Sequence, residues 1–95
     1  MHASLWTFRG DPDELLARFD AMLADVPVAQ MPATLALRTP DGLLVVDTCP
    51  TREAYERFRD GEWFAGLLAR HGLPRPLMQD YPVERAVLAG ELALA

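Results

Sequence analysis

The spacing of apolar positions along the chain alternates between the periods of strands and helices. Residues 2–9 read as a strand, which Gly10 ends. The run Asp11-Pro12-Asp13-Glu14 has the residue types of a helix start: a capping acid, a proline at the first helical position and the acid of a capping box. An apolar stripe of helical period follows, and we expect this helix to end at Pro27. The stripe consists of Leu15, Leu16, Phe19, Met22, Leu23 and Val26.

Two strands and a tight turn are predicted next, after a loop at 28–32. Residues 33–39 and 43–48 are the strands, and Thr39-Pro40-Asp41-Gly42 between them has the chemistry of a turn. A connection this short predicts an antiparallel hairpin. The segment 43–48 is apolar on both faces, so we expect both faces of the sheet to be covered there.

A second helix is predicted between Thr51, its capping residue, and Gly72. The Asp60-Gly61 pair in its middle indicates either a kink or two short helices. A last strand is predicted within 76–89, bent at Pro82, and residues 90–95 are expected to form a terminal arm.

The predicted order is β-α-β-β-α-β, the ferredoxin-like arrangement of the α+β class. We expect one domain over residues 1–95, with a four-stranded antiparallel sheet and both helices on one face. Hydrophobic residues make up 51% of the chain, which is more than a lone domain of this length easily buries. The sheet of a second copy is the simplest cover for the other face, so the sequence predicts a homodimer.

Composition excludes several classes of function. The net charge is −5 and no basic patch is present, so nucleic acid is not expected as a partner. No apolar stretch reaches about 18 residues, so no membrane span is expected, and no signal peptide is recognisable. A cytoplasmic protein is expected. One cysteine and two histidines far apart in sequence lack the clustering that metal ligands show, so no metal site is predicted.

Strand parity places Arg38 and Asp47 on one face of the hairpin, together with apolar neighbours. A carboxylate in a buried strand needs a partner. Asp47 is therefore either a structural group, in an ion pair or bonded to backbone amides at a helix start, or a polar anchor in a ligand cavity.

His71 is the residue best suited by type to acid–base chemistry, although a histidine at a helix C-terminus also fits a structural role. Asp47, His71 and Arg38 are the candidate catalytic residues. An aromatic set either walls a flat hydrophobic pocket or forms plain core and dimer interface: Trp6, Phe8, Tyr55, Phe58, Trp63, Phe64 and Tyr81. The candidates for substrate binding are Trp6, Phe8, Arg38, Asp47, Tyr55 and Trp63.

Four segments of the chain resemble a known family. They are GDPDELLARFDAML, DGLLVVDTCPTREAYERF, WFAGLLARHGLPRP and a terminal strand that opens with YPV. Together they resemble small actinobacterial proteins of the dimeric α/β-barrel group that are related to the antibiotic biosynthesis monooxygenases. The resemblance implies two four-stranded sheets packed face to face as an eight-stranded barrel, with the helices outside.

The resemblance also implies a range of activities. Members of the family include oxygenases that need no metal or flavin and act on aromatic polyketides, and others that degrade haem or isomerise lactones. Similar relatives carry a tryptophan just after the third-strand aspartate, where this chain has Thr48, Cys49 and Pro50. Haem-degrading members need an asparagine, which this chain lacks, and a histidine about one turn before His71, so haem degradation is not expected.

Two hypotheses follow. The first is a cofactor-independent monooxygenase, isomerase or cyclase that acts on a hydrophobic aromatic or polyketide-like substrate. The second is a non-catalytic module for ligand binding or oligomerisation. A cavity above about 300 Å³ lined by Arg38, Asp47 or His71 would favour the enzyme, and a solid core would favour the module.

Overall fold

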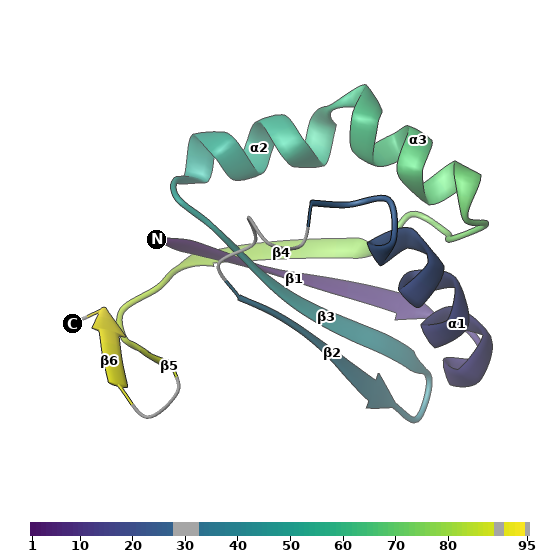
Figure 1. Cartoon of the computed structure of the whole chain (residues 1–95), viewed down its shortest axis with the longest axis horizontal. Helices are drawn as coiled ribbons and strands as arrows, with labels where there is room; N and C mark the ends of the chain where they lie inside the picture. Colours follow the sequence, from purple (N-terminus) through teal and green to yellow (C-terminus); the bar gives the residue numbers. More distant parts are fainter. Residues whose placement is uncertain (28–32, 89–90, 95) are drawn as a thin grey trace.

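A four-stranded antiparallel sheet carries three helices on one of its faces in the computed structural model of the chain (Figure 1). The structure describes residues 1–27, 33–88 and 91–94. The strands lie in the order β2-β3-β1-β4, and this antiparallel sheet with its helices is the ferredoxin-like α+β fold that the sequence predicts. The elements are β1 (His2–Arg9), α1 (Pro12–Leu23), β2 (Thr34–Thr39), β3 (Gly42–Cys49), α2 (Arg52–Asp60), α3 (Glu62–Arg70), β4 (Leu77–Pro82), β5 (Ala86–Leu88) and β6 (Glu91–Leu94).

The starts of α1 and α2 follow from side-chain caps. The Asp11 carboxylate accepts a hydrogen bond from the backbone N–H of Glu14 at 3.3 Å, which confirms the predicted start of α1. The Thr51 hydroxyl accepts one from the backbone N–H of Ala54 at 3.1 Å at the start of α2. Each cap satisfies an amide that has no partner within its helix.

The helix ends differ in part from the expectation. Helix α1 ends at Leu23, before the predicted stop at Pro27, and Val26 lies in a turn closed by its N–H on the carbonyl of Leu23. The second predicted helix is two helices, and the break is at Gly61, where the backbone is extended. A Cβ on Gly61 would lie 2.7 Å from the carbonyl oxygen of Arg57, so no larger residue fits there without a shift of the backbone.

The predicted last strand is wrong beyond Pro82. Strand β4 ends at that proline, and the chain then forms a separate two-stranded sheet of β5 and β6, which stands clear of the main sheet in Figure 1. The physical reason is that β4 pairs with β1, whose first residue, His2, lies opposite Pro82, so that after one further hydrogen bond, from the Val83 N–H to the Met1 carbonyl, β1 offers no partner. Residues 91–94, expected in a terminal arm, are strand β6. The loop predicted at 28–32 and residues 89, 90 and 95 lie outside the described part of the chain.

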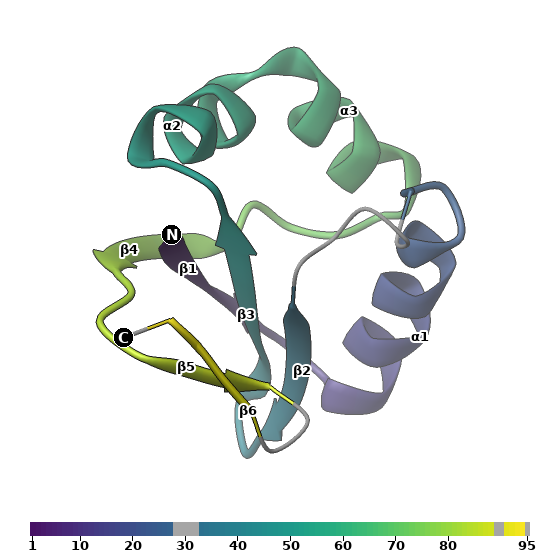
Figure 2. The ribbon, with the colours of Figure 1, turned by 60° about the vertical axis from the view of Figure 1, so that its left-hand side comes forward.

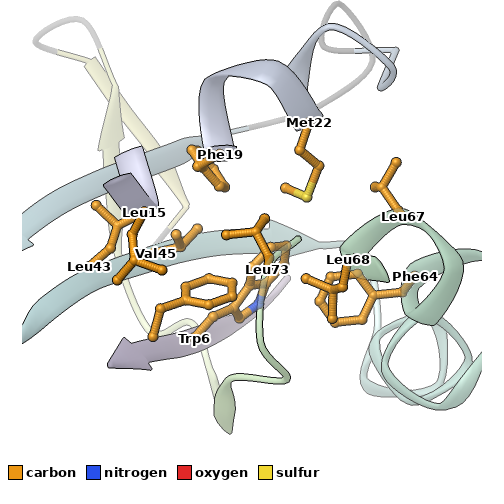
Figure 3. Packing of buried hydrophobic residues seen from close by; sticks show 11 residues of the cluster. Trp6, Leu15, Phe19, Met22, Leu43, Val45, Phe64, Leu67, Leu68 and Leu73 are labelled. Atoms are coloured by element: carbon orange, nitrogen blue, oxygen red, sulfur yellow. The ribbon is translucent and has the colours of Figure 1, made fainter. Parts of the chain in front are cut away.

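The core lies between the sheet and the three helices that cover one of its faces (Figure 2). Alternate residues of β1 point into it, and Trp6 and Phe8 are buried there. Figure 3 shows Phe19 and Met22 reaching down from α1 and Phe64 and Leu67 approaching from α3. Burying these side chains is the main source of stability.

The opposite face of the sheet keeps apolar side chains in contact with solvent. All three helices lie on the core face (Figure 2). By strand register, the outer face carries exposed Leu35, Leu37, Leu77 and Tyr81. Leu35 is 60% exposed and Leu77 is 62% exposed. The predicted excess of apolar surface is therefore present on this face of the chain. None of the described helices is long and apolar enough to cross a membrane.

Candidate functional site

A cavity of about 260 Å³ lies between the sheet and the helices. Strands β1, β2 and β3 form its base, α1 and the turn after it form one wall, and α2 and α3 form the other. Its volume is slightly below the about 300 Å³ at which ligand pockets usually begin, so it suits a molecule smaller than a typical drug. The described residues that line it are Trp6, Phe19, Met22, Leu23, Val26, Pro27, Thr34, Asp47, Phe58, Trp63, Phe64 and Leu67.

Aromatic rings form one side of this cavity. The indole of Trp6 stacks on Phe58 with ring centroids 5.6 Å apart and an interplanar angle of 24°. Phe58 contacts Phe64 at 4.4 Å and Trp63 at 6.0 Å between centroids. Trp63 is 54% exposed and therefore borders the cavity from the solvent side. Flat, offset surfaces of this kind favour aromatic ligands.

Asp47 is the charged residue in the described lining. Its Oδ1 accepts a hydrogen bond from the Thr34 hydroxyl at 2.7 Å, from the directly opposite position on β2. Burial raises the pKa of the Asp47 carboxyl above its ordinary value, while hydrogen bonds from the Thr34 side chain and the Thr48 backbone lower the pKa in part. A carboxyl with a raised pKa can take up and release a proton closer to neutral pH than an exposed aspartate.

Arg38 lies outside the lining of the cavity. It shares a face with Asp47, as parity predicts, but it stands opposite Leu43 at the turn end of the hairpin, whereas Asp47 stands opposite Thr34 at the other end. Its guanidinium pairs with Asp13 of α1 at 2.7 Å, where both side chains are exposed. An ion pair was one of the alternatives for Asp47, and Arg38 does not supply it, because the two residues lie at opposite ends of the hairpin.

His71 also lies outside the lining. Its Nε2 is 2.7 Å from Oδ2 of Asp25. This contact connects the end of α3 to the turn after α1. This bond lowers the pKa of the exposed Asp25 carboxyl. The geometry gives His71 a structural partner at a helix terminus, the alternative that the sequence left open.

The six candidates for substrate binding separate into two groups. Trp6, Asp47 and Trp63 line the cavity. Phe8 and Tyr55 are buried at 1% exposure but are not among its lining residues, because Phe8 packs in the core and Tyr55 lies over His2 with centroids 6.0 Å apart. Arg38 is the third residue outside the lining.

Several lining residues were not candidates in the sequence. Strand parity alone puts Thr34 on the same face as Asp47, but nothing in the sequence showed that the two side chains would be hydrogen-bonded. Phe19, Met22 and Val26 belong to the apolar stripe of α1, which has the same pattern whether it packs on a solid core or borders a cavity. In the described part of the chain, no three metal-ligating side chains cluster together.

No protein-family profile matches the chain, and no curated protein matches it by sequence. Among solved structures, the chain is similar to a protein from Chloroflexus aurantiacus whose assignment as an antibiotic biosynthesis monooxygenase is provisional, with a TM-score of 0.56 and 14% identity over 86% of this chain and 92% of that one. It is also similar to SnoaB, a cofactor-independent oxygenase from Streptomyces nogalater, with a TM-score of 0.49 and 19% identity over 90% of this chain and 92% of that one.

The likeness to the Chloroflexus aurantiacus protein concerns the fold. The chain has the ferredoxin-like fold of antibiotic biosynthesis monooxygenase-like proteins, as the resemblance in its sequence indicated. At such low identity, fold alone does not decide function. The actinobacterial relationship stays a prediction.

Proposed function

We propose that the cavity binds a small, flat, largely apolar molecule with a single polar group, and that Asp47 exchanges a proton with that group. The observation that carries this proposal is a carboxyl with a raised pKa among aromatic and aliphatic side chains in a cavity of about 260 Å³. Stacking on the Trp6 side would hold the ring system, and Asp47 would orient its polar end. The other catalytic candidates, Arg38 and His71, have no role in this proposal, because neither lines the cavity.

The chemistry that fits these groups begins with removal of a proton from the substrate. A carboxylate beside a phenol, or beside a carbon next to a carbonyl group, can act as a general base. The resulting anion can move its double bond, close a ring or react with dioxygen. The reaction class is therefore that of a cofactor-independent monooxygenase, isomerase or cyclase.

The oxygenation case balances without a metal or flavin. A methylene group that is activated by neighbouring rings loses two hydrogen atoms and gains one oxygen atom from dioxygen, which gives a carbonyl group and one molecule of water. The substrate supplies all the electrons. Asp47 would take the first proton and return it to the departing oxygen atom.

A non-catalytic binding module is the second candidate, and one observation favours it. The hydrogen bond from Thr34 already satisfies one oxygen of Asp47 at 2.7 Å, which is what a purely structural carboxylate requires. In this case the cavity would bind the same kind of ligand without turning it over.

We also propose that the chain pairs with a second copy through the outer face of its sheet. This face exposes Leu35, Leu37, Leu77 and Tyr81, and exposed apolar groups gathered on one face are typical of protein interfaces. Two such faces packed together would form the predicted barrel. A cytoplasmic location remains a prediction from sequence.

Turnover of a tricyclic anthrone tests the catalytic proposal. Its central methylene is acidic, and oxidation to the quinone consumes one dioxygen, which an oxygen electrode measures. We expect uptake with the unsubstituted protein that falls to the uncatalysed rate in Asp47→Asn and is unchanged in Asp20→Asn, an exposed acid of α1. Binding of anthrone without uptake would support the module.

A further inference from the structure

We propose that Ser4, which does not line the cavity, is a positioning residue that sets the orientation of Trp6 and with it the ligand preference of the cavity. The inference rests on the proposed function, because it assigns a role in that same site. Its basis is one buried hydrogen bond, in which Nε1 of Trp6 donates to Oγ of Ser4 at 2.9 Å.

The two residues are neighbours on the inward face of β1. They are two positions apart, so their side chains leave the strand on the same side. Ser4 is 2% exposed and Trp6 is 3% exposed, so water does not compete for the bond. The indole therefore leans along the strand toward Ser4 while its ring face stacks on Phe58.

A serine at this position meets two requirements. Its small side chain leaves room for the indole, and its oxygen accepts the one hydrogen bond that an indole can donate. A buried indole N–H without an acceptor is costly, so loss of the serine oxygen destabilises the present orientation of Trp6 relative to orientations in which the N–H finds another acceptor. Packing by Phe58 and Phe64 limits this motion but offers the N–H no acceptor.

The bond also decides which part of Trp6 a ligand meets. With the N–H committed to Ser4, the indole offers the cavity its carbon surface and no hydrogen-bond donor. The wall then favours aromatic hydrocarbons over isosteres that carry a hydrogen-bond acceptor, because such an acceptor would lose its water without gaining a partner there. Without Ser4 Oγ, the N–H becomes available to a ligand.

Naphthalene and quinoline are a matched pair of probes, since quinoline has the same shape and one acceptor nitrogen. Binding is followed by NMR through the two tryptophan indole N–H peaks, and Trp63→Phe assigns the Trp6 peak. We expect Ser4→Ala to lower naphthalene affinity about three- to tenfold, because the ligand must then restore an orientation of Trp6 that the lost bond no longer holds. We expect quinoline affinity to fall less or to rise. Ser4→Thr, which keeps the hydroxyl, should retain the preference of the unsubstituted protein for naphthalene over quinoline.

The indole peak tests the bond itself without a ligand. In Ser4→Ala the Trp6 N–H peak should move upfield and its hydrogen should exchange faster, and in Ser4→Thr it should stay in place. In a Trp6→Phe background, Ser4→Ala should have no further effect on naphthalene affinity, because the residue through which Ser4 acts is gone.

The outcomes separate the two proposals. If the Trp6 N–H peak and the ratio of naphthalene affinity to quinoline affinity are both unchanged in Ser4→Ala, the proposed role of Ser4 is wrong. The proposed function then stays in place. A further loss of affinity in the Trp6→Phe background would also overturn the role of Ser4, since Ser4 would then act by another route. Failure of both probes to bind the unsubstituted protein would overturn the proposed function itself, and the role of Ser4 in binding with it.

Discussion

Thr34 and Asp47 face each other across β2 and β3, and the Thr34 hydroxyl donates a hydrogen bond of 2.7 Å to the Asp47 carboxylate. The pair lies where the apolar wall of the cavity meets the sheet. Burial and this bond act on Asp47 in opposite directions, because burial raises the pKa of its carboxyl and the hydroxyl lowers it. The balance between them determines how readily Asp47 can exchange a proton.

Asp47→Asn should change how stability depends on pH. Because burial raises the pKa of Asp47 above its ordinary value of 3.8, the native chain binds this proton more tightly than the unfolded chain does. The stabilising contribution of the proton is complete below the unfolded pKa and is lost as pH rises through the folded pKa. The asparagine variant cannot ionise, so its free energy of unfolding relative to the unsubstituted protein should increase over this range. Urea unfolding over a range of pH measures this difference, with Asp20→Asn as control. If the free energies of unfolding of Asp47→Asn and the unsubstituted protein depended on pH in the same way, the pKa of Asp47 would not be raised by folding.

Thr34→Val should raise the pKa of Asp47 further. Valine has the shape of threonine without the hydroxyl, so burial would act with less opposition on the carboxyl. The measurement is an NMR titration of the Asp47 carboxyl carbon. Thr7→Val, on the outer face of β1, is the matched control and should leave this titration in place. A lower pKa in Thr34→Val would show that the hydroxyl does not stabilise the ionised form.

Phe64 and Trp63 are adjacent in sequence and should respond differently to truncation. Phe64 is fully buried in the core, so Phe64→Ala should lower the free energy of unfolding by about 3–5 kcal/mol. Trp63 is 54% exposed, so Trp63→Ala should cost much less stability but weaken the binding of aromatic ligands. Denaturant unfolding and ligand titration of both variants check this. Equal losses of stability would mean that Trp63 belongs to the core rather than to the border of the cavity.

Leu35→Asp should dissociate the proposed dimer. The substitution places a charge within an apolar contact on the outer face of the sheet, where it would lose its water without gaining a partner. Sedimentation velocity should show a dimer for the unsubstituted chain and a monomer for the variant. Ala17→Asp, on the exposed side of α1, should remain dimeric. A monomer for the unsubstituted chain at all concentrations would refute the proposed pairing.

The sequence predicted the sheet because period-two patterns and turn residues are local properties. The hairpin register agrees with the parity argument, since Thr34 pairs with Asp47 and Arg38 with Leu43. The break at Gly61 was one of two stated alternatives. The end of α1 and the hairpin of β5 and β6 were not predicted, because apolar residues continue past Leu23 and past Pro82 without a change of pattern.

The site was only partly predictable, because it depends on how elements pack. Parity placed Asp47 on the same face as Arg38, but whether its neighbour there is Arg38 or Thr34 depends on its position along the strand. His71 bonds to Asp25, which is 46 positions away in sequence and on another element. The Trp6–Ser4 bond was equally unpredictable, because a serine side chain in a strand can also face solvent or bond to a nearby backbone group.

The pair naphthalene and naphthol measures whether Asp47 binds the polar group of a ligand, because naphthol adds one hydroxyl group to the same ring system. Both tryptophans line the cavity, so their indole N–H peaks report binding at the site itself. If Asp47 accepts a hydrogen bond from the ligand, naphthol should bind about tenfold more tightly than naphthalene, and Asp47→Leu should abolish this difference while naphthalene still binds. Equal affinities of the two ligands for the unsubstituted protein, or an advantage of naphthol that survives in Asp47→Leu, would show that Asp47 does not bind the polar group of the ligand.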